Sequence, residues 1–401
     1  MGQHDTGLLE QAAAILPGLV KLRRAIHAEP ELGLHNPLTT QKILADIADL
    51  PLEIRQGPST TGVMAILRGA RPGRTVLLRG DTDALPMPED TDLDYKSRFH
   101  NVMHACGHDT HAAMLAGAAR LLSARQAELA GTVMFMFQPG EEGYHGARFM
   151  MDDGLLDDPA PEAAFALHIM PNAPHGVFTG RAGPLLASAD KISIWVDGKG
   201  GHASQPHDCT DPIPIACEIV SAIQAMVTRT APVSDPAVVT VAKIEAGTTN
   251  NVIPESAYLH GTMRTLSERR RDEIQTNLRR LANGISAAHG ATARLEFERG
   301  FPVTICDGRV VDLGAAVVTE LFGAGAWLPM AQPLMGAEDF AYVLQKVPGA
   351  MFFLGASHQG SDWRSCCPVH SNRMVLDDSV MARGAALHAA VAERFLARGF
   401  A

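Results

Sequence analysis

The chain has 401 residues, of which 46% are hydrophobic and 19% are charged. This composition is ordinary for a folded protein and excludes a disordered chain, and a length prior of roughly 150 residues per domain predicts two or three domains. The formal net charge is −10, from 34 basic and 44 acidic residues, which argues against nucleic acids and anionic membranes as partners because both require clustered Lys and Arg.

The start of the chain does not resemble a secretory signal. Residues 1–10 lack the basic region and apolar stretch of a secretory signal, and no later apolar run reaches the roughly 18 residues that a membrane span needs. Six cysteines are too few for a disulfide framework in a chain of this length. We therefore expect reduced thiols and a cytoplasmic protein.

Helices and strands alternate along the first 170 residues. Apolar residues at helical spacing predict helices over 8–28, 38–49 and 105–123. Runs rich in β-branched and apolar residues predict strands over 62–68, 75–80, 131–138 and 163–169. This alternation predicts a mostly parallel, doubly wound α/β sheet, in which functional groups gather just past the carboxyl ends of the strands.

The middle of the chain follows a different order. Its sequence pattern predicts strands over 191–196, 238–245, 256–265 and 292–298, with helices over 211–229 and 267–288. This β-α-β-β-α-β order is typical of a four-stranded antiparallel sheet with helices on one face. This arrangement predicts a domain at 186–299 that is inserted into a discontinuous catalytic domain of 1–185 and 300–401. The α/β pattern resumes after the insertion, with helices near 309–322 and 378–397 and a strand at 350–354.

A cysteine and a histidine two residues apart stand at the entry of the helix predicted from 105. At an irregular helix entry, Cys106 and His108 can turn toward one point. A thiolate and an imidazole suit Zn, Mn, Co or Ni better than Mg or Ca. For an isolated pair of this kind, a buried cysteine near capping histidines is the alternative interpretation.

Acidic residues follow two of the predicted strands. Glu141 and Glu142 come directly after an apolar strand, where two adjacent carboxylates repel each other unless a positive charge is present or one is protonated. One carboxylate on a metal and its neighbour as a general base is a natural division, and a solvated acidic turn is the alternative. Asp81 and Asp83 end another strand and could hold a ligating histidine in place. His168 and His370, taken alone, are equally consistent with core or loop histidines.

Seven short motifs stand in order along nearly the whole chain, between Arg24–Gly33 and Val369–Ser371. They are Asp81–Pro86, His104–Asp109, Gln138–Gly143, Ala166–His168, Gly200–Ala203, Asn251–Pro254 and Met335–Phe340. In this combination the sequence resembles the M20 metallopeptidase superfamily, in particular its aminoacylase, hippurate hydrolase and indole-acetyl-amino-acid hydrolase group. The resemblance implies a catalytic α/β domain with a dinuclear metal site, interrupted by a smaller ferredoxin-like α+β domain that serves as lid and dimerisation domain.

The resemblance also implies roles for single residues. Two divalent ions (Zn, Mn, Co or Ni) would be bound by Cys106, His108, Glu142, His168 and His370. Glu141 would be the general base, and Asp81 and Asp83 would support the ligands. In the lid, His202 would stabilise the oxyanion in the active site of the partner subunit, and the substrate would contact Asn251, Arg264 and Gly336. For Asn251 and Arg264 the residues alone leave open a turn-capping amide and a surface arginine.

The implied reaction is hydrolysis of the amide bond of N-acyl-amino acids, small molecules that yield a carboxylic acid and a free amino acid. Glu141 would move a proton from water to the leaving nitrogen, and the working unit would be a cytoplasmic homodimer. A dipeptidase or carboxypeptidase with the same site and a non-catalytic metal-binding homologue are the alternatives. The chain departs from the family pattern at Leu34–Asn36, Gly80, Thr82, Cys366–Cys367 and Met374, and these departures leave the acyl-group preference open but not the reaction.

Overall fold

The computed structural model describes residues 3–400 and divides into two compact units. Unit 1 comprises Met1–Leu185, Ile305–Gln332 and Asp339–Ala401, and unit 2 comprises Leu186–Thr304 and Pro333–Glu338. Segments 300–304 and 333–338, which the sequence placed in the catalytic domain, belong to unit 2. They do so because the backbone N–H of Ala189 donates to Phe301 (3.0 Å) and that of Ala187 donates to Gly336 (2.8 Å).

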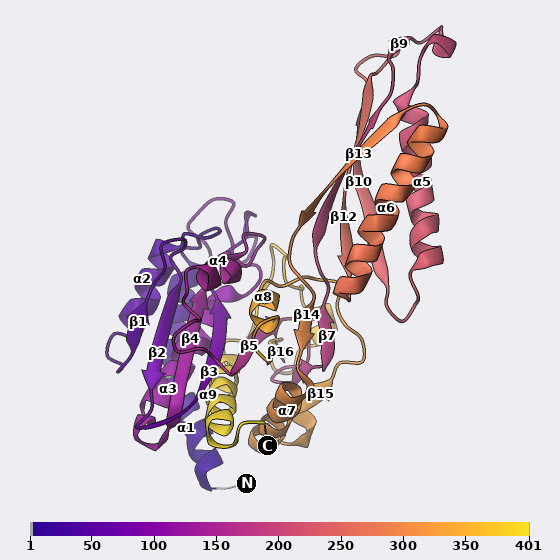
Figure 1. Cartoon of the computed structure of the whole chain (residues 1–401). Helices are drawn as coiled ribbons and strands as arrows, with labels where there is room; N and C mark the ends of the chain where they lie inside the picture. The colour runs from indigo at the N-terminus through magenta and orange to yellow at the C-terminus, as the bar shows by residue number, and fades with distance from the viewer. Residues whose placement is uncertain (1–2, 401) are drawn as a thin grey trace. The chain divides into compact units, whose positions relative to one another are not determined.

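An eight-stranded sheet forms the centre of unit 1, in the order β1-β2-β4-β3-β5-β16-β6-β15 (Figure 1). Its strands are β1 (Glu53–Arg55), β2 (Val63–Arg68), β3 (Arg71–Asp81), β4 (Ala130–Gln138), β5 (Ala163–Met170), β6 (Phe178–Gly180), β15 (Trp327–Pro329) and β16 (Gly349–Gly355). The central strands β4, β3, β5 and β16 run parallel to one another, and the antiparallel pairings lie outside this group. The predicted α/β class with a mostly parallel sheet is confirmed.

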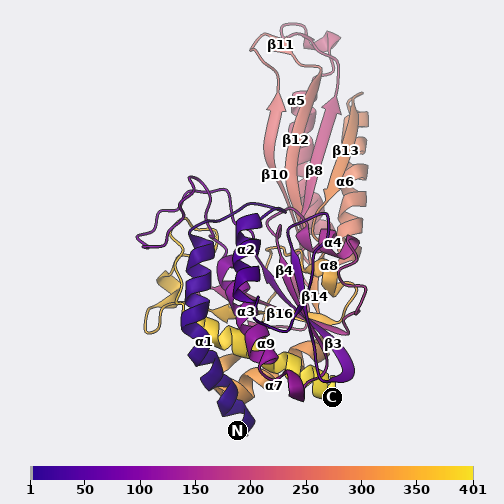
Figure 2. The same cartoon turned by 90° about the vertical axis from the view of Figure 1, so that its left-hand side faces the viewer.

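Three long helices, α1 (Gln3–His27), α3 (His108–Ser123) and α9 (Val380–Arg398), pack on one another, and α3 and α9 also pack on β3 (Figure 2). Glycine makes the close approach possible. A Cβ at Gly117 of α3 would lie 2.9 Å from Leu19 of α1 and 3.0 Å from Ala385 of α9. The remaining helices of unit 1 are α2 (Pro37–Asp46), α4 (Gly146–Asp152), α7 (Gly308–Phe322) and α8 (Ala341–Leu344).

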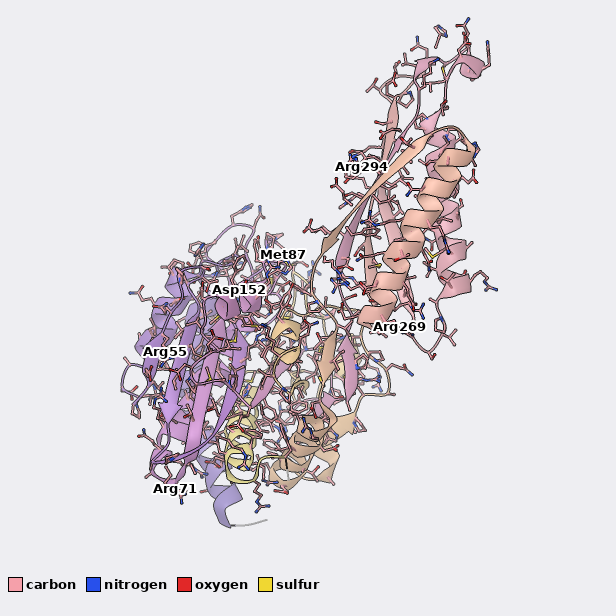
Figure 3. The ribbon with its side chains drawn as sticks, in the orientation of Figure 1. Arg55, Arg71, Met87, Asp152, Arg269 and Arg294 are labelled. Carbon is pink, nitrogen blue, oxygen red and sulfur yellow. The ribbon has the colours of Figure 1, made fainter. Side chains whose placement is uncertain are left out.

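Unit 2 is the predicted β-α-β-β-α-β arrangement. Its elements are β8 (Asp190–Asp197), α5 (Pro212–Thr230), β10 (Ala237–Ala246), β12 (Ser256–Thr265), α6 (Glu268–Ala288) and β13 (Thr292–Arg299). The sheet is antiparallel in the order β10-β12-β8-β13, and side chains such as Ile194 and Leu259 pack with those of α5 and α6. On the face without helices, Arg294 stacks 3.7 Å over the Trp195 ring (Figure 3). A small ribbon of β9 (Gly201–His202) and β11 (Val252–Ile253) extends one end of this unit.

Every predicted helix and strand is present, with its ends shifted by a few residues. One shift matters for the site: the helix expected from 105 begins at His108, so Cys106 lies on the segment before it. The short strands β7 (Gly183–Leu186) and β14 (Thr304–Cys306) pair where the chain passes between the units. Among residues 3–400, no helix is both long and apolar enough to cross a membrane, and all six cysteines are free.

Candidate metal centre

The carboxyl ends of the parallel strands bring distant sequence motifs to one edge of the sheet. Asp81 is the last residue of β3, Gln138 is the last of β4, and His168 stands two residues before the end of β5. Because these strands are parallel neighbours, their carboxyl ends meet at the same edge. The sequence predicts functional groups at this edge for the same reason, because the carboxyl ends of parallel strands lie there.

The segment before α3 presents Cys106 and His108 on either side of a glycine. Gly107 has φ +83°, in the left-handed region that an L side chain adopts only at a cost. A Cβ at this position would lie 2.5 Å from Cγ1 of Ile169, the residue that follows His168 on β5. Glycine therefore lets the backbone turn sharply against β5, so that the flanking thiol and imidazole face the end of that strand.

All five predicted metal ligands gather in one cluster. The Sγ of Cys106 lies 3.4 Å from Nε2 of His168, and Oε1 of Glu142 lies 3.3 Å from Nε2 of His370 and 4.0 Å from Nε2 of His108. Five sets of side chains have their donor atoms within 4.8 Å of one another, and three of them contain predicted ligands in the combinations Cys106–His108–His168, Cys106–Glu142–His370 and His108–Glu141–Glu142. The shared members make one continuous group, which fits two neighbouring cations better than one.

The Glu141–Glu142 turn is fixed by Asp83. The two carboxylate oxygens of Asp83 accept the backbone N–H groups of Glu141 (2.9 Å) and Glu142 (3.0 Å). Gly140 and Gly143, at either end of the turn, have φ +74° and +87°. Asp83 thus acts on the backbone that presents the two glutamates, and it also lies 3.4 Å from Nδ1 of His108.

His370 is presented by a closed turn. The backbone N–H of Ser371 donates to the Pro368 carbonyl (3.2 Å), and the N–H of His370 donates to the Ala105 carbonyl (2.6 Å). His370 has φ +66°, an uncommon conformation for a residue with a side chain. Such strain is typical of residues whose position is set by function.

His111 belongs to this region, and the sequence interpretation missed it. Its Nε2 accepts the backbone N–H of Ile169 (2.9 Å), so the ring carries its proton on Nδ1 and donates it to Asp81 (2.5 Å). Burial lowers the pKa of His111 in spite of Asp81, which agrees with a neutral ring. With both nitrogens engaged, His111 links the end of β3 to the end of β5. The only sequence signal was its position three residues after His108.

Arg79 is the second residue that the sequence interpretation missed. Its buried guanidinium donates to Asp81 (2.5 Å), to Gln138 (2.9 Å) and to Asp339 (3.1 Å), and Gln138 also donates to Asp339 (2.8 Å). Burial alone would raise the pKa of Asp81, but Arg79, with the rings of His108 and His111, holds it well below its usual range. Asp81 is therefore a carboxylate that supports the cluster through its contacts with His111 and His108.

The donor atoms fit divalent cations. The ring nitrogens of the buried His108 and Oε1 of Glu142 make no hydrogen bond with a described residue, and their neighbours at 3.3–4.0 Å are other members of the cluster and its supporting aspartates. His168 donates from Nδ1 to the Ile169 carbonyl (2.7 Å), which leaves the Nε2 lone pair toward Cys106, and burial keeps its pKa well below the usual value. Buried polar atoms without partners are costly unless an ion satisfies them.

The electrostatics of the cluster favour positive charge. Cys106 and Glu142, against the effect of burial, raise the pKa of His370 to about 10. For His108, burial would lower the pKa, but Asp81 and Cys106 raise it well above the usual value. A cluster that stabilises protons in this way also stabilises metal cations held by thiolate, imidazole and carboxylate groups.

The predicted lid residues lie in unit 2, at two different places. His202 on β9 pairs with Val252 on β11, and the N–H of Ala203 donates to the carbonyl of Asn251 (3.1 Å), so His202 and Asn251 are neighbours. Arg264 lies near the far end of β12, about 26 Å along the strand from Ser256 at ~3.3 Å per residue. Within one chain, the structure therefore does not bring Arg264 together with His202 and Asn251.

The backbone of Arg264 pairs with Val238 of β10, whereas its half-buried guanidinium makes no ion pair or hydrogen bond with a described residue. Burial lowers its pKa, against the attraction of Asp190. Gly336, in the segment that joins unit 2, accepts the N–H of Ala187 through its carbonyl (2.8 Å). An unpaired, half-buried guanidinium is suited to binding a carboxylate.

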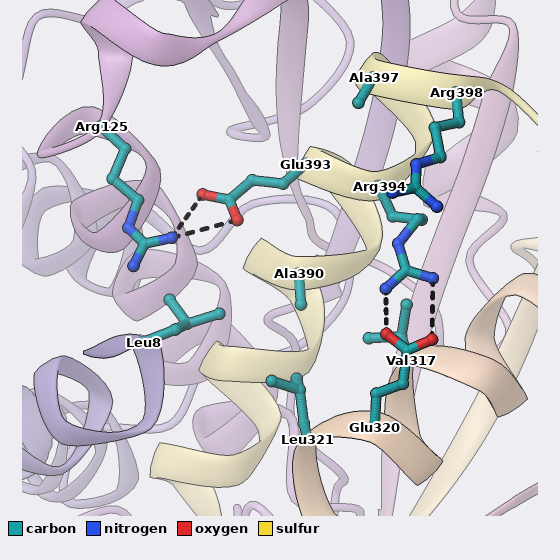
Figure 4. A pocket seen from close by; sticks show the side chains of 10 residues that line it. All are labelled: Leu8, Arg125, Val317, Glu320, Leu321, Ala390, Glu393, Arg394, Ala397 and Arg398. Atoms are coloured by element: carbon teal, nitrogen blue, oxygen red, sulfur yellow. Dashed lines mark hydrogen bonds and ion pairs between the residues drawn. The ribbon is translucent and has the colours of Figure 1, made fainter. Parts of the chain in front are cut away.

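A separate cavity of about 320 Å³ lies elsewhere in unit 1, beside α1, α7 and α9 (Figure 4). Its charged rim is largely self-neutralised, since Arg125 pairs with Glu393 (3.1 Å) and Arg394 pairs with Glu320. None of its lining residues belongs to the candidate metal cluster. This cavity is therefore not where the reactive groups converge.

Comparison with known proteins gives a consistent result. The family model "Peptidase family M20/M25/M40" matches residues 77–394. Thermostable carboxypeptidase 1 of Saccharolobus solfataricus is 38% identical over 382 residues, which cover 94% of this chain and 95% of that protein. N-acetylcysteine deacetylase of Bacillus subtilis is 38% identical over 340 residues, which cover 84% of this chain and 88% of that protein.

A solved structure is also similar over nearly the whole chain. The YXEP protein of Bacillus subtilis, described as a dinuclear metal-binding peptidase of the M20 family, superposes with a TM-score of 0.84. It is 33% identical, and the match covers 96% of this chain and 99% of that one.

Proposed function

Because the chain belongs to peptidase family M20/M25/M40, a family of metal-dependent hydrolases of amides and peptides, we propose that it cleaves the amide bond of N-acyl-amino acids. The observation that carries this proposal is the cluster of Cys106, His108, Glu142, His168 and His370 around the Glu141–Glu142 turn. The Bacillus relative named as an N-acetylcysteine deacetylase supports the substrate class. The cytoplasmic location and the homodimer are parts of the same proposal.

The five clustered side chains would hold two divalent ions of the Zn, Mn, Co or Ni type. When bound, such ions lower the pKa of water and polarise a carbonyl. Glu141 takes a proton from the attacking water and gives it to the nitrogen of the scissile amide, which is a poor leaving group until it is protonated. Asp83 holds Glu141 for this task through the backbone, and Asp81 holds His111 and faces His108.

The lid residues complete the site from two chains. His202 would donate to the carbonyl oxygen as negative charge develops there, and Arg264 would hold the free carboxylate of the substrate. Because about 26 Å of β12 separates these two ends of unit 2, one small substrate reaches only one of them in a given chain. We propose that Arg264 comes from the same chain as the metal ligands, and that His202 and Asn251 come from the partner subunit.

The edge of unit 2 offers a surface for such a dimer. Strand β10 pairs with β12 on one side, and on its other side no strand from the described residues lies beside it. This ten-residue edge carries exposed Val238 (42%) and Ile244 (53%). A long, apolar, open edge invites pairing with another strand. A second copy of the same edge, related by a two-fold axis, is the partner that we propose.

A carboxypeptidase activity is the second candidate, since a relative of that name is 38% identical. A substrate panel separates the two: N-acetyl, N-benzoyl and long-chain N-acyl amino acids against peptides with a free amino terminus. We expect turnover of the N-acyl compounds and its loss with a chelator. Preferential cleavage of peptides would replace the proposal with the carboxypeptidase, and no turnover of either class by metal-loaded protein would refute both.

The exchange of Glu141 for Gln tests the mechanism. In Glu141→Gln the amide keeps the size of the side chain but cannot accept the proton, so we expect kcat to fall by about 10²–10⁴-fold. Metal content should stay at the wild-type level because the predicted ligands are intact. Elemental analysis and steady-state kinetics measure both quantities. Wild-type kcat in this variant would remove Glu141 from the mechanism.

A further inference from the structure

Two adjacent cysteines, Cys366 and Cys367, lie on the segment that leads to His370. Both thiols are free and half-buried. The proposed reaction uses neither of them. The nearby Cys106 is buried in the metal cluster, and Cys306 is buried where its pKa rises to about 11, so these two are far less available to a dissolved reagent.

The segment between the two thiols and His370 is short and stiff. Pro368 has its φ fixed by the ring, and the hydrogen bond from Ser371 N–H to the Pro368 carbonyl closes the turn that presents His370. Only Val369 lies between Pro368 and His370. A rotation of the backbone at Cys366 or Cys367 is therefore passed on to the turn, because the turn has few free dihedral angles to absorb it.

The thiols themselves are lightly held. The Sγ of Cys366 has only long contacts, 3.9 Å to the carbonyl of Asp362 and 3.9 Å to Oγ of Ser361. The N–H of Cys366 donates to the Trp363 carbonyl (3.2 Å), and the residue is extended, with φ −70° and ψ 142°. The side chains can rearrange without breaking a strong interaction.

We propose that Cys366 and Cys367 form a redox-modification site, which a hydroperoxide oxidises to a disulfide between neighbouring residues. One thiolate bonds to the terminal peroxide oxygen as the O–O bond breaks, giving a sulfenic acid and an alcohol or water. The other thiol attacks that sulfur, forms the S–S bond and releases water. The two sulfurs lose two electrons to the peroxide, and their two protons leave in the released products.

This disulfide would be easily reversed. Neighbouring Cα atoms are 3.80 Å apart across a trans peptide, whereas disulfides usually join Cα atoms 4.4–6.8 Å apart. The bond is therefore strained, and strained disulfides are reduced readily by dithiols. The pair is suited to cycling between two states.

Closing the ring changes the backbone at the start of the stiff segment and moves His370 relative to Glu142, which lies 3.3 Å from its Nε2. The consequence for activity rests on the proposed function, in which His370 holds a metal ion. In that case oxidation weakens metal binding and stops turnover, and reduction restores both.

The test uses the full-length, metal-loaded protein treated with hydrogen peroxide. Trypsin releases the peptide Ser365–Arg373, which contains both cysteines, and its mass reports the site without any substrate. We expect this peptide to lose two hydrogens and activity to fall by about 10-fold or more, the usual cost of disturbing the surroundings of a metal ligand. Dithiothreitol should return the mass, the metal content and the activity.

Two variants provide the controls. Cys367→Ser should keep its basal activity, form no disulfide in this peptide and resist peroxide. Cys217→Ser removes an exposed thiol of unit 2 and should respond as the wild type does. An unchanged peptide in inactivated wild type, or equal sensitivity of Cys367→Ser, would refute the site. A disulfide that forms without loss of metal or activity would refute the coupling to His370.

Discussion

The roles of the histidines around the metal centre follow from which ring nitrogens the protein already uses. His111 uses both, one toward Asp81 and one toward the backbone of Ile169. His168 uses Nδ1 and leaves Nε2 free to face Cys106. Neither ring nitrogen of His108 makes a hydrogen bond with a described residue. Since a metal ion needs a nitrogen lone pair, His108 and His168 suit ligation and His111 suits support.

Replacing His111 by Phe tests this division. His111→Phe leaves the N–H of Ile169 without its acceptor and removes one of the two side-chain donors to Asp81, so we expect metal affinity to fall by about 10–100-fold. His111→Asn, which can still donate to Asp81, should lose less. Competition with a metal chelator measures the affinity of each variant. Equal affinity in the wild type and in His111→Phe would contradict the supporting role.

His388 gives a pH dependence to the stability of the fold. This histidine of α9 is buried, and burial, with a smaller effect of His111, lowers its pKa to about 3. The unfolded chain has a histidine pKa near 6.5, so between these values the unfolded state binds one more proton. Stability is therefore complete above pH 6.5 and falls toward pH 3, by at most about 1.4 kcal/mol per pH unit for this group.

We expect His388→Leu to lose stability less steeply than the wild type between pH 6.5 and 4. Urea denaturation at several pH values measures the difference between the two slopes, in which contributions from the other histidines cancel. Parallel slopes would show that His388 keeps its ordinary pKa in the fold.

The sequence located the clustered side chains better than the residues that support them. Cys106, His108, Glu141 and Glu142 stand in short local motifs, and a local motif is readable in one dimension. Arg79 was not predicted as part of the centre because one of its partners, Asp339, is 260 residues away along the chain. His111 was given no role, since the backbone of β5 supplies one of its two contacts. Only the fold shows such pairs.

At the scale of elements, the junction between Cys106 and α3 sets the geometry of the centre. The periodicity of apolar residues predicted a helix from 105, three residues before its observed start. Periodicity does not register a residue that leaves helical dihedral angles, and Gly107 does so at φ +83°. The late start frees the Cys106 side chain from the helix and aims it toward β5. A helix beginning at 105 would point Cys106 and His108 in different directions.

Adding one methyl group at this junction should be costly. In Gly107→Ala the new Cβ lies 2.5 Å from the Ile169 side chain, and the alanine must adopt the left-handed backbone conformation of Gly107. We therefore expect the free energy of unfolding to fall by about 2–4 kcal/mol. Gly290→Ala has a similar φ of +72° but open space around its Cβ, and it should show the backbone cost alone. Thermal unfolding compares the two. If Gly107→Ala loses no more stability than Gly290→Ala, β5 shifts to accommodate the added methyl group.

At the scale of the molecule, β12 separates the functional groups of unit 2. Arg264 lies near one end of this strand, while His202 and Asn251 lie on the ribbon beyond the other end. The succession of helices and strands in unit 2 was readable from the sequence, but which residues face one substrate was not, because two chains would contribute to each site. The sequence resemblance pointed to a shared site, and the length of β12 supplies a physical reason for it.

Mixing two inactive variants tests the sharing. Glu141→Gln supplies an intact His202, and His202→Ala supplies an intact Glu141, so a mixed dimer regains one working site. After subunit exchange we expect roughly a quarter of the wild-type activity, the statistical share of repaired sites. Activity of the mixture and exchange of labelled subunits are measured together. Exchange without recovery of activity would place His202 and Glu141 in the same chain.

The length of β12 also has a consequence for how the protein behaves on dilution. If one chain brings Arg264 and the next brings His202, a separated chain retains only part of a site. The rate per chain then depends on protein concentration and declines once dilution passes the dissociation constant of the pair. The rate per chain would therefore be low where the protein is scarce, and the total rate in a cell would rise more steeply than the protein concentration.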